Sequence, residues 1–202
     1  MKRKLTVEYE EFSSRKELPA ADRALLDAAI DALKGSYAPY SHFNVGAAVR
    51  LADGTVVKGA NQENAAYPSG LCAERTAMFA AGAQHPGVPF EAIAVVCARE
   101  GQLTANPGSP CGACRQVMAQ YEREAGKPLH IILGSGATIF TLDGVESLMP
   151  FVFNDLKKRK KGKLDISHRY NHLPLLRSSP GGVQWELVVY DLPRHKDKHF
   201  FD

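Results

Sequence analysis

The sequence predicts an α/β protein in which helices cover a mostly buried, mixed β-sheet. Two observations lead to this class: apolar runs of strand length alternate with helix-length segments, and Gly/Pro-containing loops separate them. With 202 residues, 45% of them hydrophobic, the chain is long enough for one well-buried domain and an appendage. The sequence has no internal repeat, and no apolar run approaches the ~18 residues that span a bilayer.

The first third of the chain is predicted to contain one helix and three strands. In residues 19–34 the apolar side chains recur at i, i+1, i+4, i+5 and i+8, which gives a helix one apolar stripe, and Gly35 ends it. Strands are expected at residues 5–9, 43–51 and 55–60, the last two joined by a tight turn at Asp53-Gly54.

The middle of the chain places its cysteines at helix starts. Helices are expected over residues 73–83 and 111–124, strands over 92–98, 129–133 and 138–141, a Gly/Pro loop over 101–110 and a short helix over 145–148. Cys72 therefore lies at or near the N-terminus of one helix. The other two motif cysteines lie in the first turn of the second helix.

Two short motifs together indicate a metal centre. Cys72 precedes Glu74 by two residues, and Pro110-Cys111-Gly112-Ala113-Cys114 has the Cys-x-x-Cys spacing of zinc ligands. Three sulfurs leave a tetrahedral zinc one position short, which is the position that catalytic zinc keeps for water. Glu74 can then work beside the metal as a proton carrier, as in the signature of zinc-dependent base deaminases. The alternatives are a structural zinc completed by Cys97 or a distant histidine, and a Glu74 that only favours the helix start.

The negative charge of the three thiolates is predicted to be offset by positive charge nearby. Three thiolates on Zn²⁺ leave a net charge of about −1, which weakens the metal as a Lewis acid. Two helix N-termini converge on the site, and Arg75 can add a full positive charge next to the thiolates. We therefore expect a site tuned back toward an acidic water.

Net charge argues against a nucleic-acid reader. The chain carries a formal charge of +3, but residues 157–163 alone hold six Lys or Arg side chains, and residues 1–156 sum to −3. A protein that reads nucleic acid is expected to have its basic residues on the folded face. The N-terminus has basic residues without an apolar stretch behind them, and three cysteines in metal spacing favour a reducing compartment, so we expect a cytoplasmic protein without a membrane partner.

Four ordered runs resemble one known family, the small, homotetrameric cytidine deaminases with three zinc-binding cysteines. The resemblance covers about residues 20–156 and is carried by residues 37–48, 61–68, 72–77 and 109–116. It implies a three-layer α-β-α fold with a mixed central sheet, one Zn²⁺ per chain, and hydrolytic deamination of cytidine and deoxycytidine in pyrimidine salvage. It also implies a homotetramer whose active sites lie between subunits.

The same resemblance assigns roles by position. It implies that Cys72, Cys111 and Cys114 bind zinc and that Glu74 transfers protons between the attacking water and N3 of the base. The remaining matches are substrate contacts: Asn61 and Glu63 to the ribose 3′-hydroxyl, Phe43 to the base, the Ala73 amide to the base carbonyl, the Ser109 carbonyl to the amino group, and Tyr67 and Phe153 as aromatics from across the subunit interface.

Several of these residues also have simpler interpretations. Asn61 and Glu63 could cap a loop, while Phe43 and Phe153 could be core aromatics, and Phe151 competes with Phe153 for the interface role. Cys97 is interpreted as a small core hydrophobe. The competing functions are nucleic-acid cytosine deamination and a non-catalytic, zinc-stabilised binding module.

The domain prediction places the catalytic domain at residues 1–156, a basic linker at 157–163 and an extension of unknown role at 164–202. In the extension, His168/His172 and His195/His199 share an i, i+4 spacing that suits either metal chelation on a helix or a solvated tail. Residues 183–192 alternate like a strand that could pair with an exposed edge.

Overall fold

The computed structural model describes residues 2–153, 175–178 and 185–188. The chain divides into two compact units, Met1–Asp155 and Leu156–Asp202. The basic run at 157–163 and the four tail histidines lie outside the described residues.

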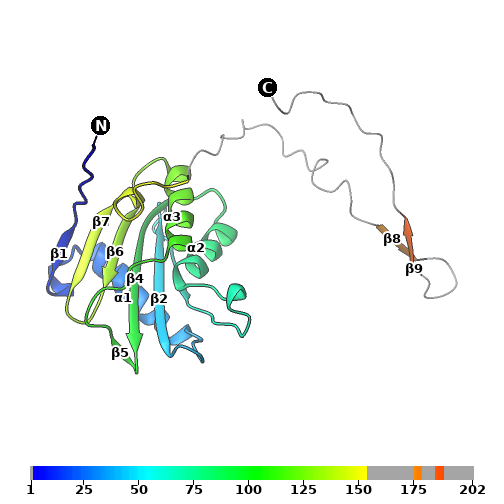
Figure 1. Cartoon of the computed structure of the whole chain (residues 1–202), viewed down its shortest axis with the longest axis horizontal. Helices are drawn as coiled ribbons and strands as arrows, with labels where there is room; N and C mark the ends of the chain where they lie inside the picture. The colour runs from blue at the N-terminus through cyan, green and yellow to red at the C-terminus, as the bar shows by residue number, and fades with distance from the viewer. Residues whose placement is uncertain (1, 154–174, 179–184, 189–202) are drawn as a thin grey trace. The chain divides into compact units, whose positions relative to one another are not determined.

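A seven-stranded mixed sheet forms the centre of the first unit (Figure 1). The β4–β6 pair is parallel, and the other pairs of this sheet are antiparallel. The strand order is β1-β7-β6-β4-β2-β3, with β5 paired to β4. The strands are β1 Glu10–Phe12, β2 Phe43–Leu51, β3 Val56–Ala60, β4 Phe90–Arg99, β5 Gln102–Leu103, β6 His130–Gly134 and β7 Ile139–Asp143.

Helices cover both faces of this sheet, which confirms the predicted three-layer arrangement (Figure 1). On one face, α1 (Ala20–Ala32) buries its apolar stripe against side chains of β2, β4, β6 and β7. On the other face, α2 (Ala73–Gln84) and α3 (Gly112–Ala125) share a second core with the same sheet. The 3-10 turns are η1 Arg15–Glu17, η2 Leu33–Gly35, η3 Tyr67–Ser69 and η4 Val145–Ser147.

Close packing of α2 on β3 fixes the helix that begins with the first motif cysteine. A Cβ at Gly59 would lie 2.3 Å from the Ala77 backbone nitrogen, so only glycine allows this approach. The helix backbone therefore rests directly on the strand, and the start of α2 is held against the sheet.

Most predicted elements are confirmed, with three corrections. The strand expected at residues 5–9 is wrong: β1 begins only at Glu10, and Leu5 and Val7 are exposed because they meet no sheet neighbour. The loop predicted at 101–110 contains β5, which turns back onto β4 after Glu100 and Gly101, both with positive φ.

The third correction lies in the second unit. The strand predicted at residues 183–192 is present as β9 (Trp185–Val188). Its partner is β8 (Leu175–Ser178), in an antiparallel pair with Ser178 opposite Trp185, where the sequence had left pairing with an exposed edge open.

Candidate zinc centre and substrate pocket

Three cysteine sulfurs gather at the N-termini of α2 and α3. Cys72 and Cys111 are the N-cap residues of the two helices, and Cys114 lies in the first turn of α3. The Cys72 and Cys111 sulfurs are 3.8 Å apart, the Cys111 and Cys114 sulfurs are 3.5 Å apart, and all three lie within 4.8 Å of one another. Zinc with ~2.3 Å bonds in tetrahedral geometry requires sulfurs about 3.8 Å apart, so the cluster fits this ion.

The cluster has no fourth protein ligand among the described residues, since the group of metal-ligating atoms comprises only the three thiols. Cys97, considered above as a candidate to complete a structural site, is outside this group. Three protein ligands with one open position is the arrangement of catalytic zinc.

The Cys72 and Cys114 thiols differ in the direction of their pKa shifts. A hydrogen bond from Cys114, followed by interactions with Arg75, lowers the pKa of Cys72 to about 5, and the same sharing raises the pKa of Cys114. The Arg75 Nη2 atom lies 3.7 Å from the Cys72 sulfur. The Arg75 guanidinium is therefore close enough to offset thiolate charge, and that role stays a prediction.

Glu74 lies beside the sulfurs in the first turn of α2. Its side chain is almost completely buried, with 4% of the residue exposed, yet it lines the pocket next to the cysteines. Burial, and secondarily the charge of Cys72, raises the pKa of the Glu74 carboxyl. A carboxyl group that holds its proton more readily than usual is suited to carrying protons.

The pocket above the cluster has a volume of about 550 Å³. Cys72, Glu74 and Cys111 lie in its wall, and Val95 and Cys97 of β4 line it from the sheet. Of the predicted substrate contacts, the pocket is also lined by Phe43, Asn61, Glu63, Tyr67 and Ser109.

Asn61 and Glu63 are both held in place by hydrogen bonds. The Asn61 amide accepts from Ser36 Oγ (2.6 Å) and the Val45 amide (2.8 Å) and donates to the Phe43 carbonyl (2.9 Å). The Glu63 carboxylate accepts from the Tyr40 and Ser41 amides at 2.9 and 3.2 Å. A side-chain hydrogen bond from Ser41, then that of the Tyr40 amide, lowers the pKa of the Glu63 carboxyl, so an anion faces the pocket.

The predicted aromatic contacts are found in different surroundings. Phe43 at the start of β2 lines the pocket with the Arg99 guanidinium 5.7 Å from its ring centre. Tyr67 is 70% exposed and lines the pocket of its own chain, with its ring 5.9 Å from that of Tyr40. Phe151 and Phe153 are both exposed and do not line this pocket. A contribution of Tyr67 or Phe153 across an interface stays a prediction.

Ala73 is fully buried as the first residue of α2. Its side chain does not line the pocket. Backbone N–H groups in a first helical turn have no carbonyl partner within the helix, which is the property that the predicted contact with the base requires.

Sequence reasoning missed Cys97 as a pocket residue and Arg115 as a structural link. The alternation of β4 could have found the first, because Cys97 is two residues from Val95 and therefore faces the same pocket. The polar contacts of Arg115 join segments 33 residues apart, and no local pattern indicates them.

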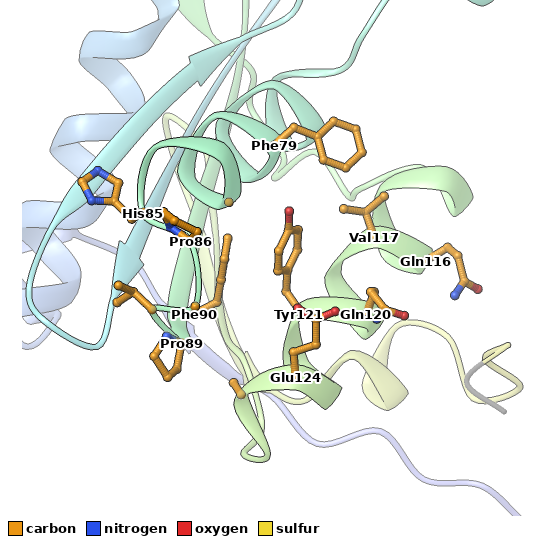
Figure 2. Close-up of a pocket in the computed structure, with 14 residues that line it drawn as sticks. Phe79, His85, Pro86, Pro89, Phe90, Gln116, Val117, Gln120, Tyr121 and Glu124 are labelled. Carbon is orange, nitrogen blue, oxygen red and sulfur yellow. Dashed lines mark hydrogen bonds between the residues drawn. The ribbon is translucent and has the colours of Figure 1, made fainter. Parts of the chain in front are cut away.

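A second hollow of about 600 Å³ lies between α2 and α3 (Figure 2). Phe90 and Tyr121 stack in it with ring centres 3.9 Å apart, and Phe79 stands at its edge. None of the motif cysteines lines it, so the chemistry of the chain belongs to the other pocket although the volumes are similar.

A zinc-binding thiolate cluster beside a buried carboxylate, on a three-layer α-β-α scaffold, defines the class of zinc-dependent base deaminases. Residues 19–125 match the family model described as the cytidine and deoxycytidylate deaminase zinc-binding region. The chain belongs to this family.

Individual relatives agree with this membership. The chain is 51% identical over 96 residues to a cytidine deaminase of Halalkalibacterium halodurans, an alignment covering 48% of this chain and 68% of that protein. It is 53% identical over 87 residues to a cytidine deaminase of Sporosarcina psychrophila, covering 43% of this chain and 59% of the relative. The crystal structure of a cytidine deaminase from Burkholderia pseudomallei shares 43% identity and a TM-score of 0.55, covering 64% of this chain and 97% of that one.

Proposed function

We propose that this chain catalyses the zinc-dependent hydrolytic deamination of cytidine and deoxycytidine, giving the uridine nucleosides and ammonia. The observation that carries the proposal is the gathering of three cysteine sulfurs beside the buried Glu74 in one pocket. Membership of the cytidine deaminase family supports it.

The reaction replaces the amino group on C4 of the base with the oxygen of water. Cys72, Cys111 and Cys114 would hold the zinc ion, which would supply a Lewis acid that makes water more acidic. Glu74 takes one proton from the attacking water and delivers it to N3; it then passes the remaining proton of the new C4 hydroxyl to the amino group, so that the C4–N bond breaks, ammonia leaves and the C4 carbonyl forms. Arg75 offsets the negative charge of the thiolates.

The walls of the pocket orient the nucleoside. Glu63 and Asn61, which line the pocket, are proposed to bind the ribose 3′-hydroxyl, and Phe43 is proposed to offer its aromatic surface to the base. The Ala73 amide and the Ser109 carbonyl are proposed to bind the base carbonyl and the amino group. These contacts hold C4 of the base close to Glu74. The reaction is then accelerated because the reacting groups are already oriented.

The competing functions fit this site less well. The Glu63 carboxylate would repel the phosphate that a polynucleotide carries at the 3′ position, and residues 1–156 have a net charge of −3. A zinc module without catalysis gives no reason to bury a carboxylate in a pocket wall, because such burial is costly.

An absorbance assay tests the proposal. The purified protein is incubated separately with cytidine, deoxycytidine, CMP and a cytosine-containing oligonucleotide, and the loss of absorbance is measured for each. We expect turnover of the two nucleosides and little of the phosphorylated substrates. Preferential turnover of the oligonucleotide, or no turnover of any substrate by zinc-loaded protein, would refute it.

We further propose that the protein works in pyrimidine salvage in the cytoplasm. All four cysteines are free thiols in the structure, which suits a reducing compartment. In the part of the chain that the structure describes, no helix is long and apolar enough to cross a membrane. Fractionation of expressing cells, with deaminase activity measured in each fraction, tests the location.

A homotetramer with sites between subunits is the proposed assembly. Its support in this chain is a set of large aromatic side chains left in contact with solvent, which on a monomer are costly to expose. These are Tyr9, Tyr37, Tyr40, Tyr67, Phe79, Phe151 and Phe153.

A further inference from the structure

The side chain of Arg115 connects the pocket wall to a segment far away in sequence. Arg115 directly follows the zinc ligand Cys114 in the first turn of α3. Its Nε atom donates to the Pro110 carbonyl at 2.7 Å, and Nη2 donates to Ser109 Oγ at 2.9 Å. Its Nη1 atom donates to the Leu148 carbonyl at 2.5 Å. One guanidinium thus binds three acceptors on two separate segments.

The next residue continues the same connection. Gln116 Nε2 donates to the Phe153 carbonyl at 2.6 Å, so both ends of the segment from Leu148 to Phe153 are hydrogen-bonded to the start of α3. Figure 2 shows the Gln116 side chain at the opposite end of the hollow from His85. Between these two bonds Val152 packs against the core beneath α2 and α3.

We propose that Arg115 is a positioning residue for the deamination reaction. It holds the Ser109–Pro110 segment in place and couples it to the segment 148–153. The inference rests on the proposed function for its kinetic part. The coupling itself is a property of the fold and can be measured without a substrate.

The position of Ser109 and Pro110 matters because they lead directly into the zinc ligands. The Pro110 carbonyl belongs to the peptide bond whose nitrogen is that of Cys111, so its bond to Arg115 fixes the orientation of that peptide. Ser109 is exposed in the pocket wall, where its carbonyl is proposed to face the amino group of the base. A shift of about 1 Å at such a contact can cost ~100-fold in rate.

Arginine is required for this geometry. The planar guanidinium presents its N–H groups in a rigid fork, and the Arg115 side chain is half-buried. A lysine ammonium at the same place is a point charge on a flexible stem, so we expect it to retain one of the carbonyl bonds and lose the others.

The test compares full-length, zinc-loaded wild type with Arg115→Lys and Arg115→Met. Arg23→Met is the matched control, because Arg23 is an exposed residue of α1 on the opposite face of the sheet. We expect kcat/KM for cytidine to fall by ~10- to 100-fold in Arg115→Met, mainly through kcat, with a smaller fall in Arg115→Lys. Zinc content should stay at the wild-type value, and inhibition by uridine, which lacks the amino group, should change less than twofold.

Hydrogen exchange supplies the readout that does not depend on activity. In Arg115→Met, amides of both segments, 108–111 and 148–153, should exchange faster than in wild type, and the control should leave both unchanged. Faster exchange in only one segment would overturn the coupling, and equal weakening of uridine binding and cytidine turnover would overturn the positioning role. If Arg115→Met does not fold, Arg115→Lys decides the question by the same criteria. An inactive wild type with the expected exchange pattern would refute the proposed function and leave the coupling intact.

Discussion

The Glu74 side chain combines two properties that rarely occur together, near-complete burial and contact with a pocket. Burial penalises the carboxylate and raises its pKa, which brings the protonated and charged forms closer in free energy. A group in this balance can accept a proton from water and release it to a base ring with little driving force lost.

Substitution of Glu74 by glutamine separates this role from metal binding. Glu74→Gln keeps the size of the side chain and removes the proton carrier, so turnover should fall by ~10²- to 10⁴-fold or more. Zinc content should remain about one ion per chain by atomic absorption, since Glu74 is not among the three clustered ligands. Glu11→Gln, on the exposed edge strand β1, is the control and should retain full activity. Loss of zinc in Glu74→Gln would place the carboxylate among the metal ligands and contradict the assignment.

At the scale of single residues, the sequence predicts which side chains carry the chemistry better than it predicts which residues surround them. The Cys-x-x-Cys spacing of Cys111 and Cys114 and the position of Glu74 two residues after Cys72 are local features of the sequence. The motifs therefore indicate them directly. The three hydrogen bonds of the Arg115 guanidinium and the pocket position of Cys97 depend on contacts between segments apart in the sequence, such as Gly108 against the Cys97 sulfur. The periodicity of apolar residues alone does not predict such contacts.

At the scale of elements, the site depends on two helices that begin at the same place. The N-termini of α2 and α3 bring their cysteines together because both helices pack on one face of the sheet. Unpaired backbone N–H groups and the positive ends of the helix dipoles then favour thiolates. The strand-helix alternation predicts these elements, whereas the parallel pairing of β4 and β6 is fixed only by the three-dimensional core.

The close approach of α2 to β3 provides a test of this arrangement. Gly59→Ala should destabilise the fold by ~1 to 3 kcal/mol, because the new Cβ would overlap the α2 backbone near Ala77 and force the helix away. The measurements are the midpoint temperature of thermal unfolding and the zinc content per chain, and both should decrease. Gly35→Ala is the control, since its nearest neighbour would be the Ala60 Cβ at an ordinary 3.7 Å. Equal stability of the two variants would show that α2 can shift without cost.

At the scale of the whole molecule, the proposed boundary between catalytic domain and tail can be tested by truncation. The described site and its cores all lie within residues 2–153. A chain ending at Leu156 should therefore fold, bind zinc and deaminate cytidine with kcat/KM within about threefold of the full chain. Circular dichroism and the absorbance assay measure this. An insoluble or inactive product would mean that part of residues 157–202 belongs to the catalytic fold.

The proposed assembly makes a stronger prediction about Phe153. This side chain is 66% exposed, while its carbonyl is fixed by Gln116, so the ring is presented outward from an anchored backbone. If it closes over the base bound by a neighbouring subunit, Phe153→Ala should lower kcat/KM without loss of zinc, because water enters the site and the base is less confined. The corresponding change at Phe151, which is 97% exposed, serves as the matched comparison and decides which aromatic has the role.

Mixed assemblies then test whether the ring acts across the interface. Co-expression of Glu74→Ala and Phe153→Ala chains yields hybrid tetramers in which some sites combine an intact Glu74 with an intact Phe153 from the other chain. Activity per zinc should exceed that of either variant alone, because each chain supplies what the other lacks at those sites. Native mass spectrometry confirms that hybrids have formed. Hybrids no more active than the separate variants would mean that Phe153 acts within its own chain, and that the tetramer does not build the site.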